Sequence, residues 1–142
     1  MPKSENPQTD VFIELHIPDF ALATKFYEKL GFTVVWQEEP PKGYLVMQKG
    51  ESIINFYGGD PEVYQQEYFK KFPEETPRGY AVEIILLSDD IDKYYQELSA
   101  KINSITEPLS LRPWGRKDFR LTDPFGFYIR VSERYNWINK YS

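Results

Sequence analysis

Hydrophobic and polar residues alternate over Val11–Ile17, with Ile13 on the inward side, and this period of two predicts a half-buried strand. Apolar residues at helical spacing follow, between Asp19, which can cap a helix, and Gly31, which stands where a helix-ending glycine belongs. The alternation then returns in three segments separated by turn residues, namely Phe32–Gln37, Tyr44–Gln48 and Ser52–Tyr57. The first half is therefore predicted to have the order β-α-β-β-β.

The second half repeats this order of periods. Tyr80–Leu87 is an apolar strand interrupted only by Glu83, and Asp90 can cap the short helix that follows it. The remaining segments are predicted as a weak strand, a proline-containing turn or edge, and two strands, over Ile102–Ile105, Glu107–Trp114, Lys117–Thr122 and Phe127–Ser132. A short aromatic helix is predicted over Pro61–Phe72, because the connection that contains it is long for a simple loop.

The repetition indicates a duplicated module and an α+β fold. We expect two tandem βαβββ modules, residues 11–57 and 80–132, that form a curved mixed sheet with a concave groove and with the helices on the convex face. Residues 58–79 connect the modules, residues 133–142 form an aromatic tail, and residues 1–142 are interpreted as one domain. Such a groove needs an apolar or aromatic lining with a few placed polar groups.

Composition excludes several classes of function. A net charge of −5 over 142 residues argues against binding to nucleic acid, which requires a basic surface. The chain has no apolar run of the roughly 18 residues that a membrane helix needs, so we expect a cytoplasmic protein with no membrane partner. Zero Cys and one His exclude thiolate metal sites and sites that need two imidazoles from one chain. Aromatic residues nevertheless make up 17% of the chain, which is the feature most in need of an explanation.

Two motifs carry a resemblance to a known family. Asp19-Phe20, Phe26-Tyr27 and Leu30-Gly31-Phe32 resemble a signature of the vicinal oxygen chelate (VOC) superfamily, which includes glyoxalase I, extradiol dioxygenases and bleomycin resistance proteins. Trp114-Gly115-Arg116, Asp118-Phe119 and Asp123-Pro124-Phe125-Gly126 are similar to the closing hairpin of that superfamily. The match runs from about Val11 to Val131, and the order of the motifs agrees with the duplication.

The resemblance implies where the metal-dependent members place their ligands. The four corresponding residues of this chain are Phe12, Asn55, Glu83 and Arg130. Phe12 has no donor atom, and Arg130 is a permanent cation that repels a metal ion. We therefore expect no metal and no cofactor.

The Glu83–Arg130 pair and the single histidine each have two interpretations. Glu83 and Arg130 are predicted to form a charge-assisted pair on adjacent strands, and the alternative is that Glu83 is a solvated residue on the strand face. His16 is the one candidate general base, but a lone, exposed histidine at a strand end is the favoured interpretation.

Aromatic residues on the predicted cleft face provide the best indication of a site. The predicted ligand-binding residues are Phe12, Glu14, Asn55, Tyr57, Glu83, Trp114, Tyr128 and Arg130, with Tyr44, Tyr64 and Tyr68 as further candidates. Aromatic faces stack on planar rings and hold cations, and the acidic balance of the chain favours a cationic or polar aromatic ligand. The resemblance to metal-free bleomycin resistance proteins implies a homodimer that sequesters a small molecule and has no catalytic residues.

Three alternatives remain open at this point. The chain could be a divergent glyoxalase I-like lyase or extradiol dioxygenase-like metalloenzyme that recruits a metal through Glu14, His16 and Glu83. The aromatic residues could fill a sheet-to-sheet interface between two copies of the chain. The protein could also be a regulatory or structural dimer with a closed groove.

Overall fold

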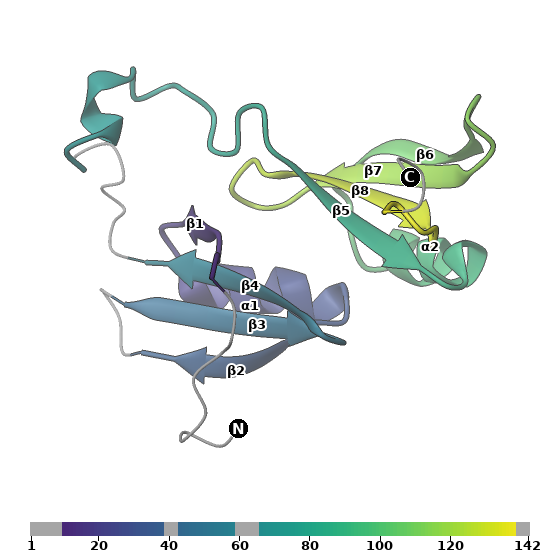
Figure 1. Cartoon of the computed structure of the whole chain (residues 1–142), viewed down its shortest axis with the longest axis horizontal. Coiled ribbons are helices and arrows are strands. Elements are labelled where there is room, and N and C mark those ends of the chain that lie inside the picture. The colour runs from purple at the N-terminus through teal and green to yellow at the C-terminus, as the bar shows by residue number, and fades with distance from the viewer. Residues whose placement is uncertain (1–9, 39–42, 59–65, 139–142) are drawn as a thin grey trace. The chain divides into compact units, whose positions relative to one another are not determined.

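A computed structural model describes residues 10–38, 43–58 and 66–138. The chain forms two compact units that divide between Thr76 and Pro77, and each unit contains one β-α-β-β-β module (Figure 1). Among the described residues, no helix has the length and apolar character needed to cross a membrane.

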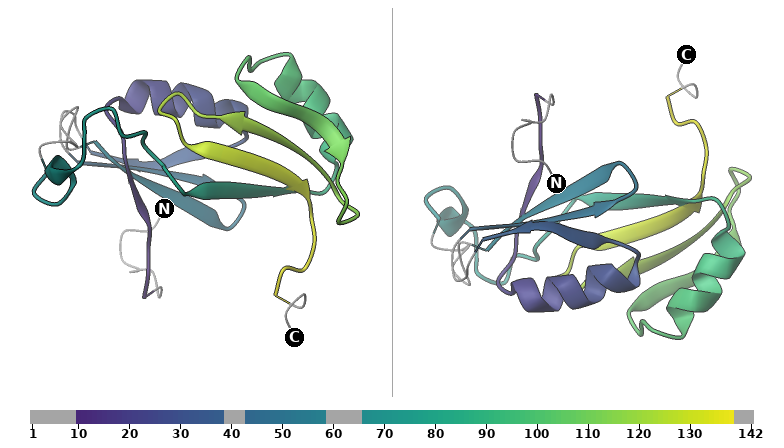
Figure 2. Two further views of the ribbon diagram at one scale, coloured as in Figure 1. Left: turned by 90° about the horizontal axis from the view of Figure 1, so that it is seen from above. Right: turned by 90° about the horizontal axis from the view of Figure 1, so that it is seen from below.

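The first module contains one mixed sheet and one α-helix. Its elements are β1 (Glu14–His16), α1 (Phe20–Lys29), β2 (Thr33–Gln37), β3 (Tyr44–Lys49) and β4 (Ser52–Tyr57), and the 3-10 helix η2 (Phe69–Lys71) follows in the connecting segment. The strand order is β1-β4-β3-β2, in which β1 runs parallel to β4 and the other pairs are antiparallel. The last strand of the module therefore lies beside the first, and α1 covers one face of the sheet (Figure 2).

The predicted capping residues fix both ends of α1. The Asp19 carboxylate accepts a hydrogen bond of 2.9 Å from the Leu22 amide at the first turn. At the other end, the amides of Gly31 and Phe32 donate to the carbonyls of Glu28 and Tyr27, and Gly31 has a φ of +102°. This is the Schellman arrangement, and it requires the left-handed backbone that glycine adopts without steric cost.

The helix-facing side of the first sheet forms the core of this module. Tyr27 of α1 packs on Phe56 of β4 with ring centroids 5.1 Å apart, and neither side chain is exposed by more than 1%. The buried apolar residues of the module are Leu15, Ile17, Phe20, Ala23, Phe26, Tyr27, Leu30, Phe32, Leu45, Met47 and Phe56. Because strand side chains alternate between faces, the other face of the sheet carries Glu14, His16, Tyr44, Asn55 and Tyr57.

The second module repeats the arrangement. Its elements are β5 (Glu83–Ser88), α2 (Ile91–Ser99), β6 (Ile105–Leu111), β7 (Lys117–Thr122) and β8 (Tyr128–Glu133). The strand order is β5-β8-β7-β6, with β5 parallel to β8. Its buried apolar residues are Ile91, Leu98, Ile102, Phe119, Leu121, Phe127, Ile129 and Val131.

A tight turn joins β7 to β8 at the predicted Asp-Pro-Phe-Gly sequence. The buried Asp123 carboxylate accepts hydrogen bonds of 2.8 Å from the amides of both Phe125 and Phe127. Gly126 has a φ of +98°, which disfavours other residues there. This turn fixes the β7–β8 register and thereby the neighbours of each β8 side chain.

Three boundary predictions were wrong. The first strand begins at Glu14 rather than Val11, and Ile13, which was expected to point inward, is 72% exposed because β4 pairs only with residues 14–16. The weak strand and the proline-containing edge are one strand, β6, whose interior holds Pro108. Register shifts on both sides of Glu107 and the edge position of β6 accommodate this proline.

The strand expected from Tyr80 begins instead at Glu83. The amides of Tyr80 and Val82 donate to the carbonyls of Pro77 and Gly79, so the chain turns before it enters β5. Of the predicted aromatic helix over Pro61–Phe72, the structure contains the single turn η2, and residues 61–65 lie outside the described residues.

The α+β class and the two βαβββ modules are confirmed, with one open four-stranded mixed sheet in each module. The concave groove that both modules would share remains a prediction, as does the interpretation of residues 1–142 as one domain.

Candidate functional site

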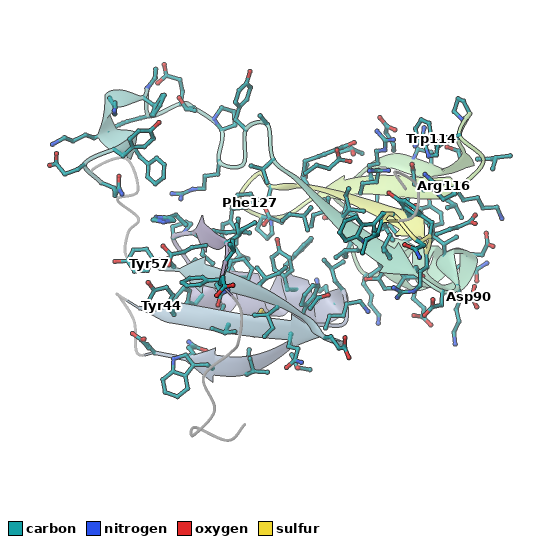
Figure 3. All side chains as sticks on the ribbon, in the orientation of Figure 1. Tyr44, Tyr57, Asp90, Trp114, Arg116 and Phe127 are labelled. Atoms are coloured by element: carbon teal, nitrogen blue, oxygen red, sulfur yellow. The ribbon has the colours of Figure 1, made fainter. Side chains whose placement is uncertain are left out.

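The open face of the first sheet gathers aromatic side chains from three strands. The register places Glu14 beside Asn55, and it places His16 and Tyr44 on either side of Tyr57. Figure 3 shows Tyr44, at the start of β3, next to Tyr57, at the end of β4. The last strand of the module thus carries its side chains between those of the first and the third.

His16, Tyr44, Tyr57 and Phe69 form what we call the aromatic cluster. Ring centroids lie 5.1 Å apart between His16 and Tyr57, 5.4 Å apart between His16 and Phe69, and 5.4 Å apart between Tyr44 and Tyr57. Phe69 comes from η2, so a segment outside the sheet completes the cluster. These tilted and edge-on contacts are typical of stabilising aromatic pairs.

Glu14 places a carboxylate beside the aromatic cluster. One of its carboxylate oxygens lies 3.1 Å from Nε2 of His16, whose side chain is 20% exposed. A hydrogen bond to the Glu14 carboxylate, with a smaller effect of burial, raises the pKa of the Tyr44 hydroxyl. His16 is therefore not the lone, exposed histidine that was expected, because it contacts a carboxylate and two aromatic rings.

Glu14→Gln is expected to lower the pKa of Tyr44 toward the ordinary tyrosine value of 10.0, because a neutral amide no longer favours the protonated phenol. The raised pKa also means that Tyr44 contributes stability below pH 10.0 that is lost as the pH rises through its folded pKa. A pH titration of the tyrosine Cζ resonances by NMR measures the shift. Tyr94 serves as the control, since burial rather than Glu14 is the main cause of its raised pKa. An unchanged Tyr44 titration in the variant would contradict the contact.

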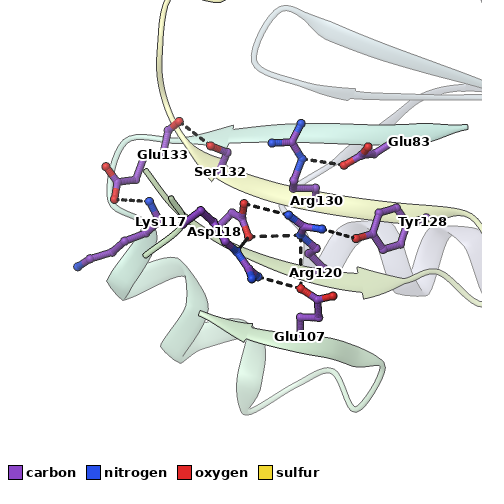
Figure 4. A network of polar contacts seen from close by, with 10 residues as sticks. Glu83, Glu107, Lys117, Asp118, Arg120, Tyr128, Arg130, Ser132 and Glu133 are labelled. Carbon is purple, nitrogen blue, oxygen red and sulfur yellow. Dashed lines mark hydrogen bonds and ion pairs between the residues drawn. The ribbon is translucent and has the colours of Figure 1, made fainter. Parts of the chain in front are cut away.

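The open face of the second sheet carries a network of charged side chains that includes one tyrosine, Tyr128 (Figure 4). Asp118 of β7 is fully buried, and its carboxylate accepts hydrogen bonds of 2.7 Å from Nε of Arg112 and 3.3 Å from Nε of Arg120. Arg112 also donates to Glu107, and Arg120 also donates to the Tyr128 hydroxyl at 3.1 Å. The hydrogen bond to Asp118 raises the pKa of Arg120, which keeps its guanidinium charged. We call Glu107, Arg112, Asp118, Arg120 and Tyr128 the arginine network.

The predicted pair of Glu83 and Arg130 is present beside this network. Nε of Arg130 donates to Oε1 of Glu83 over 2.7 Å, from β8 to the parallel strand β5. Glu83 is therefore not simply a solvated carboxylate on the strand face. The pair neutralises the Glu83 carboxylate, so this residue does not add a free negative charge for a cationic ligand.

The eight predicted site residues divide between the two modules. Glu14, Asn55 and Tyr57 share the open face of the first sheet, and Glu83, Tyr128 and Arg130 share that of the second. Phe12 lies ahead of β1 and is 64% exposed, while Trp114 lies in the turn between β6 and β7 and is 47% exposed. Neither belongs to the two clusters, and a ligand-binding role stays a prediction for all eight residues.

The sequence did not indicate five members of these clusters as site residues, namely Phe69, Glu107, Arg112, Asp118 and Arg120. Of the further candidates, Tyr44 belongs to the aromatic cluster, and Tyr64 lies outside the described residues. Tyr68 is 55% exposed and contacts Phe69 and Phe72 instead of the sheet. Within residues 10–38, 43–58 and 66–138, no group of three or more acidic or histidine side chains is arranged to hold a metal ion.

Comparisons with known proteins relate the chain to one family. A model of the "Glyoxalase/Bleomycin resistance protein/Dioxygenase superfamily" matches residues 11–131. A bleomycin resistance protein from Klebsiella pneumoniae is 26% identical over 121 residues, which cover 80% of this chain and 82% of that protein.

Two solved structures share the fold. The crystal structure of a bleomycin-binding protein complexed with bleomycin matches with a TM-score of 0.59 and 23% identity, covering 89% of this chain and all of the other. The crystal structure of a bleomycin resistance determinant encoded on the transposon Tn5 matches with a TM-score of 0.60 and 22% identity, covering 87% and 95%. From the duplicated modules and the match over residues 11–131, the chain belongs to the glyoxalase/bleomycin resistance protein/dioxygenase superfamily.

Proposed function

We propose that this protein binds and sequesters a planar small molecule and that the aromatic cluster is the surface on which the ligand ring stacks. The observation that carries the proposal is the group of Tyr44, Tyr57, His16 and Phe69 on the face of the first sheet opposite its buried core. The relationship to a bleomycin resistance protein and the fold shared with a bleomycin-binding protein support it.

The chemistry of the aromatic cluster favours a cationic or polar aromatic ligand. Tyrosine rings present a negative face that attracts a cation, and Glu14 adds a carboxylate beside them. A flat aromatic cation would therefore stack on the rings while its charge faces the carboxylate. Such a ligand is held by non-covalent contacts alone, so the mechanism we propose is stoichiometric binding without turnover.

The assembly we propose is a homodimer with two ligand grooves and no bound metal. The residues that we propose for ligand binding are Phe12, Glu14, Asn55 and Tyr57 of the first module and Glu83, Trp114, Tyr128 and Arg130 of the second. A dimer would also cover exposed apolar side chains such as Trp36 and Ile85, which are 47% and 42% exposed. Sedimentation of the purified protein tests the assembly.

The direct test uses proflavine, a flat aromatic cation, as the probe in a calorimetric titration. We expect saturable binding near one molecule per chain, and we expect Tyr57→Ala to raise the Kd about tenfold because it removes the central ring of the cluster. Tyr57→Phe should retain most of the affinity, since it keeps the ring. Tyr80→Ala is the matched control, because this tyrosine is 78% exposed and outside the cluster.

Two results would contradict the proposal. Equal proflavine affinity in Tyr57→Ala and the unchanged protein would remove the aromatic cluster from the binding surface. Near-stoichiometric Ni, Zn, Mn or Fe in the purified protein would favour the metalloenzyme alternative over metal-free capture.

A further inference from the structure

Arg130 donates fewer hydrogen bonds than its neighbours Arg112 and Arg120. Nε donates to Glu83 at 2.7 Å, and the side chain is 16% exposed. Among the described residues, the two terminal nitrogens of Arg130 donate no hydrogen bond. A largely buried guanidinium therefore presents four N–H groups without a protein partner.

The neighbouring arginines make the contrast clear (Figure 4). Arg120 uses Nε and one terminal nitrogen on Asp118 and the other terminal nitrogen on Tyr128. Arg112 uses Nε on Asp118 and a terminal nitrogen on Glu107. The terminal nitrogens of Arg130 keep contact with solvent, so a partner from outside the chain can reach them.

Tyr128 supplies a further donor on the same face. It lies two residues before Arg130 on β8, so both side chains project from one side of the strand. Its hydroxyl oxygen accepts from Arg120, and within the described residues its own proton has no acceptor. The hydroxyl can therefore donate to a ligand while the arginine network holds it in place.

Glu83 fixes the orientation of these donors. Its bond to Nε holds one edge of the planar guanidinium, so the two terminal nitrogens face away as a preorganised fork. A fork of this geometry matches two oxygens of one oxyanion, as in a carboxylate or a phosphate. A metal ion or a cationic group has no favourable contact with it.

We infer that Arg130, with the hydroxyl of Tyr128, is a binding site for an oxyanion, namely a carboxylate or phosphate group carried by the ligand. This inference rests on the proposed function as a small-molecule binding protein and assigns the group that the second module recognises. The acidic net charge of the chain does not prevent this, because contacts at a few ångströms outweigh distant charges that salt screens.

Calorimetric titration with three flat probes of one shape tests the inference. Naphthoate and naphthyl phosphate carry the oxyanion, and naphthamide is the neutral counterpart of naphthoate. We expect naphthoate, naphthyl phosphate or both to bind at least tenfold more tightly than naphthamide, and which of the two binds better identifies the oxyanion. Arg130→Gln should abolish the preference.

Two further variants test whether the geometry of the guanidinium, and not only its charge, determines the preference, and whether a loss of affinity reflects misfolding. Arg130→Lys keeps the charge but loses the fork, so it should retain only part of the preference. Glu83→Gln should raise the affinity for the oxyanion probes several-fold, because it removes a neutralising carboxylate. A gain of this kind cannot come from misfolding. Arg134→Gln is the matched control, since Nε of Arg134 also donates to a carboxylate, that of Asp89 at 2.6 Å, but on an exposed surface.

The outcomes distinguish this inference from the proposed function. Proflavine binding that depends on Tyr57, together with equal affinities for naphthoate, naphthyl phosphate and naphthamide, would overturn the oxyanion site and leave the proposed function intact. Failure of all four compounds to bind would contradict both. An oxyanion preference that survives Arg130→Gln would overturn the assignment to Arg130.

Discussion

Replacing Asp118 with alanine is expected to lower the free energy of unfolding of the second module by about 3 kcal/mol. The Asp118 carboxylate is fully buried and accepts hydrogen bonds from both Arg112 and Arg120, so its removal leaves two guanidinium groups without their shared partner. Each arginine side chain is 20% exposed, and Glu107 remains as a partner, which places the expected cost at the lower end of the range for a broken buried pair.

Urea denaturation followed by NMR signals of the second module measures this change. Asp118→Asn should cost less than the alanine variant, because the amide oxygen still accepts one hydrogen bond. The matched control is Asp89→Ala, which removes a carboxylate that also accepts from an arginine Nε but is 79% exposed; its effect should stay below about 1 kcal/mol. Equal effects of Asp118→Ala and Asp89→Ala would mean that the buried network adds nothing to stability.

Phe56→Ala is expected to destabilise the first module by about 3 to 5 kcal/mol. The Phe56 ring has no exposed surface and packs on Tyr27 of α1, so truncation leaves a cavity between the sheet and the helix. The loss should also weaken the aromatic cluster, because Phe56 and Tyr57 are consecutive residues of β4 that pack on opposite faces.

Denaturation followed by NMR signals of the first module gives the magnitude. Ile53→Ala is the control on the same strand, since its side chain lies on the open face and is 46% exposed, so its cost should stay near or below 1 kcal/mol. Comparable costs for both variants would contradict the assignment of one face of the sheet as core and the other as open.

The two modules could be predicted because each depends on local chemistry. Asp19 and Gly31 bound the first helix by hydrogen bonds within a few residues, and the Asp123–Gly126 turn does the same for the last hairpin. Alternation identified Ser52–Tyr57 and Lys117–Thr122 with the correct ends. The prediction was wrong at β6, because the strand tolerates Pro108 only through register shifts at a sheet edge that no local pattern shows.

The site could be predicted in part. Glu83 and Arg130 were expected to pair, and they do, because parallel pairing of the first and last strands of a module follows from the βαβββ order. Phe69 joins the aromatic cluster from a connecting segment, and Arg112 reaches Asp118 across a turn; neither contact has a periodic signal in the sequence. Phe12 was expected on the cleft face, but it lies outside the strand.

The sequence by itself determined the duplicated modules, their helix caps and closing turn, and the positions that carry aromatic and charged side chains. These depend on hydrogen bonds and periodicities that span only a few residues. Only the tertiary structure decided which side chains become neighbours, because β4 and β8 return to pair with strands about 40 residues earlier in the chain. That pairing neutralises Glu83 and leaves the terminal nitrogens of Arg130 without a protein partner, so the acidic balance of the whole chain does not describe the charge at this position.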